Sequence, residues 1–151
     1  MDFSLTNEQK MIIDTLKNFV EQELYPHEME VEKTNQIRPE LAAQIKQKAL
    51  DLGLYAANMP EEHGGAGLDT LTLCLMEREL GRANFGLQYI VARPSNILLA
   101  CKGDQIENYL LASIRGDKVD CLAMTEPNAG SDVRSMQCRA ERDGEDFVIN
   151  G

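Results

Sequence analysis

The chain has 151 residues, with 15 Lys and Arg against 25 Asp and Glu, so its formal net charge is −10 at pH 7. This length corresponds to one domain, or to one domain and part of a second, and a hydrophobic share of 43% is typical of a globular protein with a core. So acidic a chain lacks the basic surface that neutralises phosphates, which excludes a nucleic-acid partner. No apolar run approaches the roughly 18 residues that span a membrane.

The cysteines and histidines are too scattered to form a metal site. No two cysteines form a close pair such as C-x-x-C, and the two histidines lie far apart in the sequence. We therefore expect no metal, and we expect free thiols in a reducing compartment. The N-terminus resembles neither a signal nor a transit peptide, so we expect a cytoplasmic location.

Residues 1–117 have the pattern of an up-and-down helical domain. Thr6, followed three positions later by Gln9, predicts a capping box at the start of the first helix. Apolar residues then recur at spacings of three and four, which places them on one core-facing stripe. Pro26 is expected to stop this helix and to begin a short polar one that ends near Lys33.

Three further features continue the helical pattern. Pro39 suits the first turn of a helix that Gly53 ends with a left-handed residue. The glycine-rich stretch 60–67 is expected to be a structural turn joining two helices, and not a phosphate cradle. Asp69 is expected to cap the next helix, which runs to about Arg82.

Residues 85–100 are mostly apolar, which predicts a buried helix kinked at Pro94. Asp104 and Glu107 form a second cap signature, and the helix that follows is expected to end near Gly116.

The periodicity changes after residue 117, and we expect residues 118–151 to be the start of a β-domain. Strands are predicted at 119–125, 136–142 and from 147, with a tight hairpin turn at 143–144. Three short strands cannot bury a sheet face alone, so we expect this domain to be incomplete. The fold class is therefore mainly α: a helical domain followed by the first strands of a truncated β-domain.

The stretch from Leu122 to Asp132 is the strongest candidate for chemistry. Pro127 forces it out of a strand, and Gly130 can take a positive φ. Successive N–H groups can then face one concavity, and the hydroxyls of Thr125 and Ser131 can donate or accept hydrogen bonds. Such a segment suits a flat, acceptor-rich ring or an amide-bearing chain, although a plain surface loop explains the same residues.

Four motifs resemble the acyl-CoA dehydrogenase family. Residues 125–132 (T-E-P-N-A-G-S-D) match its T-E-P-x-A-G-S-D signature. The opening at 2–9, the P-E-E-H-G-G stretch at 60–65 with the Gly-Leu at 67–68, and M-E-R-E-L-G at 76–81 agree in order and spacing. The resemblance covers the whole chain.

The resemblance implies an FAD enzyme that converts an acyl-CoA thioester into a trans-2-enoyl-CoA and passes electrons to an electron-transfer flavoprotein. It implies removal of the α-proton and transfer of the β-hydride to the flavin. The matching cofactor-binding residues are Leu122, Met124, Thr125, Gly130 and Ser131, of which Ser131 also binds the pantetheine arm of the substrate. It further implies a homo-oligomer assembled through a C-terminal domain that this chain lacks.

Two departures limit what the resemblance carries over. The family often has an aromatic residue where this chain has Leu122. Its catalytic glutamate lies in the C-terminal domain, so no catalytic residue is assigned here, Glu126 included. The chain alone is therefore expected to be inactive.

Alternatives remain open. The complete protein could be an acyl-CoA oxidase of the same superfamily, or the scaffold could be a non-catalytic helical interaction module. By resemblance, residues 85–100 help to line the acyl-chain cavity, although core packing explains them equally well. Arg93 on this segment would meet a polar or carboxylated acyl group. The favoured interpretation is that it forms a surface salt bridge or a cap near Pro94.

Overall fold

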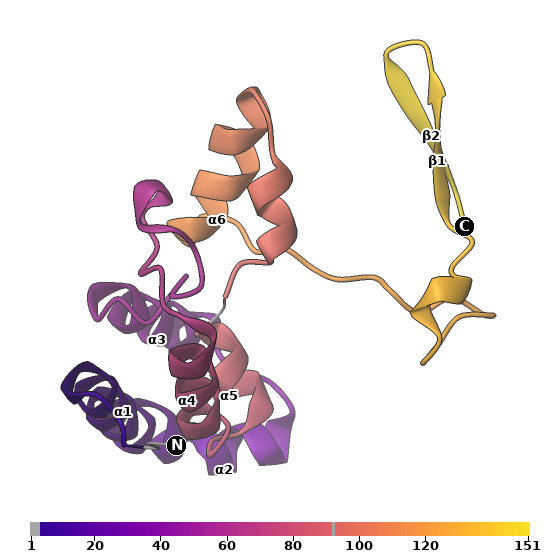
Figure 1. The fold of residues 1–151 in the computed structure, drawn as a ribbon. Helices are drawn as coiled ribbons and strands as arrows, with labels where there is room; N and C mark the ends of the chain where they lie inside the picture. The colour runs from indigo at the N-terminus through magenta and orange to yellow at the C-terminus, as the bar shows by residue number, and fades with distance from the viewer. Residues whose placement is uncertain (1–3, 92) are drawn as a thin grey trace. The chain divides into compact units, whose positions relative to one another are not determined.

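The computed structural model describes residues 4–91 and 93–151, which fall into two compact units, Met1–Asp120 and Cys121–Gly151. The first unit is helical and the second carries a β-hairpin, in agreement with the mainly α fold class (Figure 1). The predicted domain boundary between residues 117 and 118 stays a prediction. No helix in the described part of the chain is long and apolar enough to cross a membrane.

The elements of the first unit are mostly short. Its α-helices are α1 (Asn7–Phe19), α2 (Tyr25–Thr34), α3 (Pro39–Asp51), α4 (Thr70–Leu80), α5 (Phe85–Ile90) and α6 (Ala112–Ile114). π-helical turns occupy Val20–Leu24 and Ile106–Leu111, and 3-10 turns occupy Glu61–His63 and Asn96–Ala100.

The capping box that begins α1 is confirmed. The Thr6 hydroxyl accepts the Gln9 N–H at 3.1 Å, and the Gln9 side-chain oxygen accepts the Thr6 N–H at 3.1 Å. Gln9 Nε2 then donates to the hydroxyl of Thr72 at 3.2 Å, and that hydroxyl donates to Asp69, the predicted cap of α4, at 2.7 Å. These bonds link the first turns of α1 and α4. Hydrogen bonds from the Thr72 hydroxyl and the Thr72 N–H hold the pKa of Asp69 below its ordinary value.

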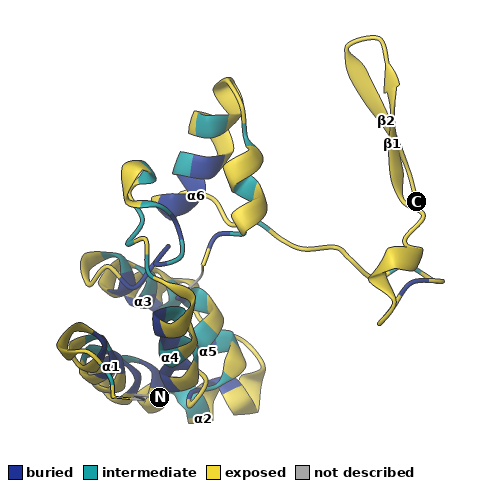
Figure 2. Cartoon of the chain, in the orientation of Figure 1, coloured by how far each residue is buried: buried dark blue, intermediate teal, exposed yellow. Residues whose placement is uncertain are grey.

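The core of the helical unit lies where α1 packs on α4 and α3 packs on α5 (Figures 1 and 2). The core-facing apolar side chains of these helices are almost completely buried, as is most of the loop between α3 and the 3-10 turn at residue 61. The largest fully buried side chains are Leu16, Val20, Leu24, Ile45, Met59, Met76, Leu80, Leu87 and Leu110.

Pro26 lies in the first turn of a short helix that ends at Thr34, as expected, but the expectation that it stops the first helix is wrong. The chain runs from α1 through the π-helical turn Val20–Leu24 directly into α2, where Pro26 occupies the first turn. Tyr25 N–H bonds to the carbonyl of Val20, five residues back. The wider turn and the position near the start of α2 accommodate a residue that has no N–H to donate.

Residues 85–100 do not form one buried helix. The helix α5 ends at Ile90, four positions before Pro94. If the helix continued, the Pro94 ring would clash with the carbonyl of Ile90. A separate 3-10 turn then begins after Ser95, whose hydroxyl accepts the Ile97 N–H at 3.4 Å. Phe85 and Ile97 are 74% and 75% exposed, so the segment is not buried either.

The cap predicted from Asp104 and Glu107 is not formed as expected. Asp104 is already part of the helical stretch and does not cap it. At this end of the stretch, the side-chain oxygen of Gln105 accepts the backbone N–H of Lys102 at 3.1 Å. The stretch is largely π-helical and ends at Gly116, which has a φ of 80°. Its end is therefore as predicted.

The second unit contains two antiparallel strands, β1 (Arg139–Asp143) and β2 (Asp146–Asn150). Asp143 pairs with Asp146, so Gly144, with a φ of 64°, lies in a two-residue turn and confirms the predicted tight hairpin. The strand predicted at 119–125 is not formed: these residues make no ladder with any described residue, and β1 starts at Arg139, later than expected. A ladder requires a partner strand, which local sequence does not provide.

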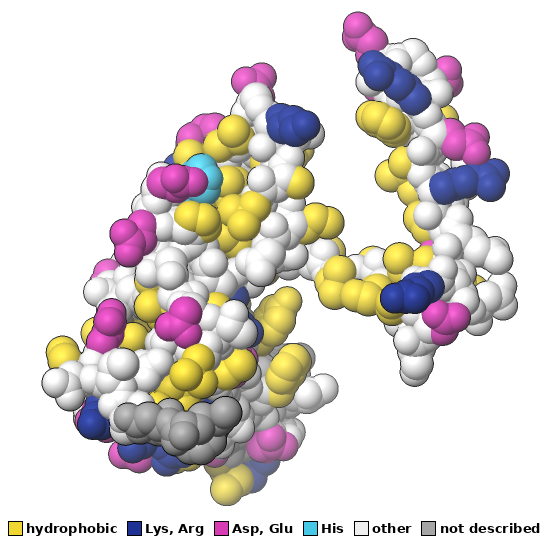
Figure 3. Space-filling view, viewed as in Figure 1, with side chains coloured by type: hydrophobic (Ala, Val, Ile, Leu, Met, Phe, Trp, Pro, Cys, Tyr) yellow, Lys and Arg dark blue, Asp and Glu magenta, His cyan; other side chains and the backbone are white. Residues whose placement is uncertain are grey.

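The hairpin presents its apolar side chains to solvent. Phe147 and Ile149, which share one face of the hairpin, are 63% and 72% exposed. Figure 3 shows hydrophobic side chains at the surface of this unit. A two-stranded sheet cannot bury such a face by itself.

Candidate functional site

The candidate segment, Cys121–Asp132, begins with residues that belong to no helix or strand and then forms a tight turn. Glu126 N–H donates to the Ala129 carbonyl at 3.0 Å, and Ala129 N–H donates back to the Glu126 carbonyl at 3.1 Å. Pro127 and Asn128 lie at the tip, and the Ala129 side chain is almost completely buried. The turn thus ends this stretch at a defined residue.

The carboxylate of Glu126 has a structural role that the sequence did not reveal. It accepts the N–H groups of Gln137 and Cys138 at 2.7 and 2.8 Å, just before β1. Asp132 similarly accepts the Arg134 N–H at 3.3 Å and a hydrogen bond from the Ser135 hydroxyl. Both carboxylates therefore hold the backbone that follows the turn, which agrees with leaving Glu126 without a catalytic assignment.

The five predicted site residues all lie at the surface of this segment. Leu122 and Met124 are 77% and 40% exposed, and Thr125, Gly130 and Ser131 are exposed as well. Gly130 does not use the positive φ that is open to a glycine, since the turn is completed before that residue. A Cβ at Gly130 would meet no atom within 4 Å. Gly130 therefore leaves open space beside the backbone.

Residues 121–125 and the Ser131 hydroxyl have no hydrogen-bond partner within their own unit, Cys121–Gly151. There, no hydrogen bond joins the backbone N–H and C=O groups of 121–125, or the hydroxyls of Thr125 and Ser131, to another described residue. Aliphatic side chains beside free amides and hydroxyls match a flat ring with carbonyl and nitrogen acceptors at its edge. The donor set thus fits the isoalloxazine of FAD.

The glycine-rich stretch 60–67 is a structural turn, as expected. Gly65 N–H donates to the Pro60 carbonyl at 3.0 Å, and Gly67 N–H donates to the Met59 carbonyl at 2.8 Å. A Cβ at Gly65 would lie 2.1 Å from the Met59 carbonyl oxygen, so only glycine fits. Within the described residues no group of His, Cys, Asp and Glu side chains is arranged to hold a metal ion, and His63 approaches Glu62 at 3.8 Å.

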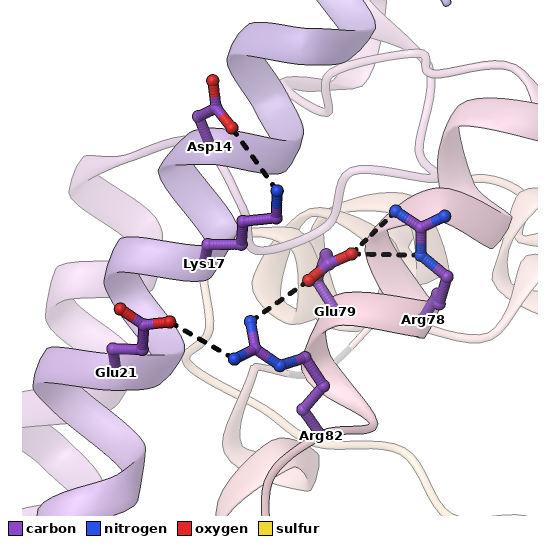
Figure 4. Close-up of polar contacts among 6 residues, drawn as sticks. All are labelled: Asp14, Lys17, Glu21, Arg78, Glu79 and Arg82. Atoms are coloured by element: carbon purple, nitrogen blue, oxygen red, sulfur yellow. Dashed lines mark hydrogen bonds and ion pairs between the residues drawn. The ribbon is translucent and has the colours of Figure 1, made fainter.

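The motif at 76–81 contributes an ion-pair network that joins α4 to the first helical segment (Figure 4). Glu79 is 5% exposed and accepts from Arg78 at 2.7 and 3.0 Å and from Arg82 at 3.3 Å. Arg82 also donates to Glu21 at 3.2 Å and lies over the Tyr25 ring. Burial acts to raise the pKa of Glu79, but the hydrogen bonds from both arginines outweigh it and lower that pKa. This network is structural.

Arg93 forms the surface salt bridge that the sequence favoured. Its Nε lies 2.9 Å from Glu77 Oε1, and each side chain is about one-third exposed. Because Arg93 is paired with Glu77, the structure does not support the alternative that Arg93 binds a polar acyl group.

Comparison with known proteins gives one consistent result. Residues 6–117 match the family model described as acyl-CoA dehydrogenase, N-terminal domain. The chain is 35% identical to a probable acyl-CoA dehydrogenase, YngJ, of Bacillus subtilis (strain 168), over 100% of this chain and 40% of that protein. It is 33% identical to the short-chain specific acyl-CoA dehydrogenase, mitochondrial, of Homo sapiens, over 97% of this chain and 36% of that protein.

Solved structures agree with the sequence relatives. An acyl-CoA dehydrogenase from Geobacillus kaustophilus superposes with a TM-score of 0.76 at 26% identity, over 100% of this chain and 40% of that one. The FAD complex of PigA gives a TM-score of 0.81 at 26% identity with the same coverage. These similarities confirm the predicted fold class, an up-and-down helical domain followed by the start of a β-domain.

The chain spans about 40% of the length of the curated relatives that it matches over its whole length. The family model covers most of the chain, and relatives exceed 30% identity over all of it. The chain belongs to the acyl-CoA dehydrogenase family.

Proposed function

We propose that this chain is the N-terminal part of an FAD-dependent acyl-CoA dehydrogenase and that its residues 122–131 bind the flavin. The observation that carries the proposal is the stretch 121–125, whose amides, together with the hydroxyls of Thr125 and Ser131, bond to no described residue of their own unit. Family membership supports the cofactor, since a related solved structure is described as an FAD complex.

Each site residue has a role that follows from its chemistry. The backbone amides around Leu122 and Met124, with the Thr125 hydroxyl, would hold the edge of the ring, while the two aliphatic side chains contact its face. Gly130 leaves room for close approach. By resemblance to the family, Ser131 would contact both the flavin and the pantetheine arm of the substrate. When bound, FAD supplies the acceptor for the hydride that leaves the β-carbon of the acyl thioester. Preorganised backbone donors would stabilise the charge that develops on the ring.

We further infer the wider setting of the reaction. The substrate is an acyl-CoA, the electron acceptor is an electron-transfer flavoprotein, and the protein is a homo-oligomer whose C-terminal domain supplies the catalytic base. The four free cysteines support a cytoplasmic location. The domain division at residues 117 and 118 is part of the same proposal.

The decisive experiment incubates the full-length protein that carries this chain with a panel of acyl-CoAs and an artificial electron acceptor. We expect enoyl-CoA formation with at least one substrate and none with the 151-residue chain alone. Oxygen serving equally well as acceptor would favour an acyl-CoA oxidase. A full-length protein that neither binds FAD nor turns over any acyl-CoA would overturn the proposal and favour a helical interaction module.

A further inference from the structure

The carboxylate of Asp120 is the last tether of the chain before the candidate segment. Its Oδ1 accepts the backbone N–H of Ser95 at 3.3 Å, and both residues belong to the helical unit. Lys118 is held by its N–H and by its ammonium group, which donate to the carbonyls of Ala112 and Asn108. Within the described helical unit, no other hydrogen bond holds Val119 or Asp120.

The backbone around Ser95, whose N–H Asp120 accepts, is itself held in place by other contacts. Ser95 lies in the non-helical break after α5, where Asn58 Nδ2 donates to the Pro94 carbonyl and to Asn96 Oδ1, each at 2.8 Å. Arg93, on the other side of Ser95, is paired with Glu77 of α4. The residues on both sides of Ser95 are therefore held by side-chain contacts, which fixes the position of its N–H group.

The charge of Asp120 also acts on a buried aromatic side chain. Burial and the Asp120 carboxylate together raise the pKa of Tyr55, whose side chain is 6% exposed. Asp120 is itself partly buried and has no ion-pair partner among the described residues. A hydrogen bond to the Ser95 N–H is thus the interaction that offsets the cost of removing this carboxylate from water.

We propose that Asp120 is a positioning residue for flavin binding, and that its bond to Ser95 fixes the point from which residues 121–131 leave the helical unit. The inference rests on the proposed function. Without the tether, the free stretch begins directly after Lys118, and binding the flavin must also order Val119 and Asp120. The ordering of additional backbone and side chains reduces affinity, so the tether acts by preorganisation.

Two pairs of variants isolate the hydrogen bond in the full-length protein. Asp120→Ala removes the acceptor, whereas Asp120→Asn keeps an oxygen that can accept the same N–H. Ser95→Pro removes the donor at a residue whose φ of −63° and ψ of 134° suit proline, whereas Ser95→Ala removes only the hydroxyl. Arg93→Ala is the control, because it breaks the ion pair with Glu77, a different contact of the segment that contains Ser95.

The measurement is the dissociation constant of FAD from the apoprotein, by flavin fluorescence, together with the apoprotein's Tm. We expect Asp120→Ala and Ser95→Pro to weaken binding about tenfold, the loss of one hydrogen bond to a charged acceptor. Asp120→Asn and Ser95→Ala should stay within about twofold of wild type, as should Arg93→Ala even where it lowers the Tm.

The outcomes separate this inference from the proposed function. Wild-type affinity in Asp120→Ala, or an equal loss in Arg93→Ala, would refute the positioning role while FAD binding by wild type stands. Should Ser95→Pro fail to fold, the comparison of Asp120→Ala with Asp120→Asn decides alone, and failure of the Asn variant to rescue binding would also contradict the tether. If wild type itself binds no FAD, the proposed function fails and this inference fails with it.

Discussion

Replacing Glu79 by Gln tests the ion-pair network of α4 with little change in side-chain shape. The Glu79 side chain is 6% exposed, while its partners Arg78 and Arg82 are 59% and 37% exposed. Both carboxylate oxygens accept arginine N–H groups, as the dashed lines in Figure 4 show. A glutamine can place its oxygen toward one arginine only, and its NH₂ group then faces the donors of the other.

The expected cost follows from these contacts. A hydrogen bond to a charged group contributes about 1.5–3 kcal/mol, and a buried polar group that loses its partner costs a similar amount. Because the arginines retain access to water, they can rehydrate, which keeps the loss below the range for a fully buried pair. We expect Glu79→Gln to lower the free energy of unfolding by about 2 kcal/mol at pH 7.

Urea unfolding of the purified chain, followed by circular dichroism at several pH values, measures this difference. The folded-state pKa of Glu79 is lowered, so the carboxylate contributes stability above its unfolded pKa, about 4.3. That contribution is lost as the pH falls through the lower, folded-state pKa. The gap between Glu79→Gln and wild type should therefore be largest near neutral pH and should close in acid.

Glu107→Gln is the matched control, because it removes the same charge from an exposed pair. Glu107 Oε1 lies 2.9 Å from Arg115 Nη2. The Glu107 side chain is 65% exposed and the Arg115 side chain is 51% exposed. Such pairs contribute about 0.2–1 kcal/mol. If Glu79→Gln costs no more than Glu107→Gln, or if its cost does not depend on pH, the account of a buried, stabilising carboxylate is wrong.

Two further substitutions test the glycine turn and the candidate site. Gly65→Ala places a Cβ 2.1 Å from the Met59 carbonyl oxygen and should cost about 3 kcal/mol in urea unfolding. Gly53→Ala, with a φ of 67° and open space around it, should cost only about 1 kcal/mol, so equal losses would contradict the close contact. Thr125→Val removes an exposed hydroxyl that bonds to no described residue of its own unit, so the free energy of unfolding should not change. In a fluorescence titration, FAD binding should weaken about fivefold. An unchanged affinity for FAD would show that Thr125 is not part of the site.

Features set by neighbouring residues were predictable from the sequence. The capping box of Thr6 and Gln9, the Asp69 cap and the hairpin turn at Gly144 each depend on a few adjacent positions, and all three are present. The exposed placement of the candidate segment, a stretch of small residues broken by Pro127, also follows its local composition.

Features that depend on distant partners were not predictable. The strand expected at 119–125 needs a neighbouring strand, and the bond between Ser95 and Asp120 joins residues far apart in the sequence. The carboxylate of Glu126 gave no sign that it would hold the backbone ahead of β1, because that contact exists only in the folded turn. The helix break was a misjudged local effect: Pro94 ends α5 completely where a kink was expected.

The most direct test of the central claim is the flavin content of the full-length protein that carries this chain. We predict that it purifies yellow, or becomes so on incubation with FAD, with about one flavin per chain and an absorbance spectrum perturbed by the protein. A folded protein that stays colourless and takes up no flavin would show that the free amides and hydroxyls of residues 121–131 serve some other purpose.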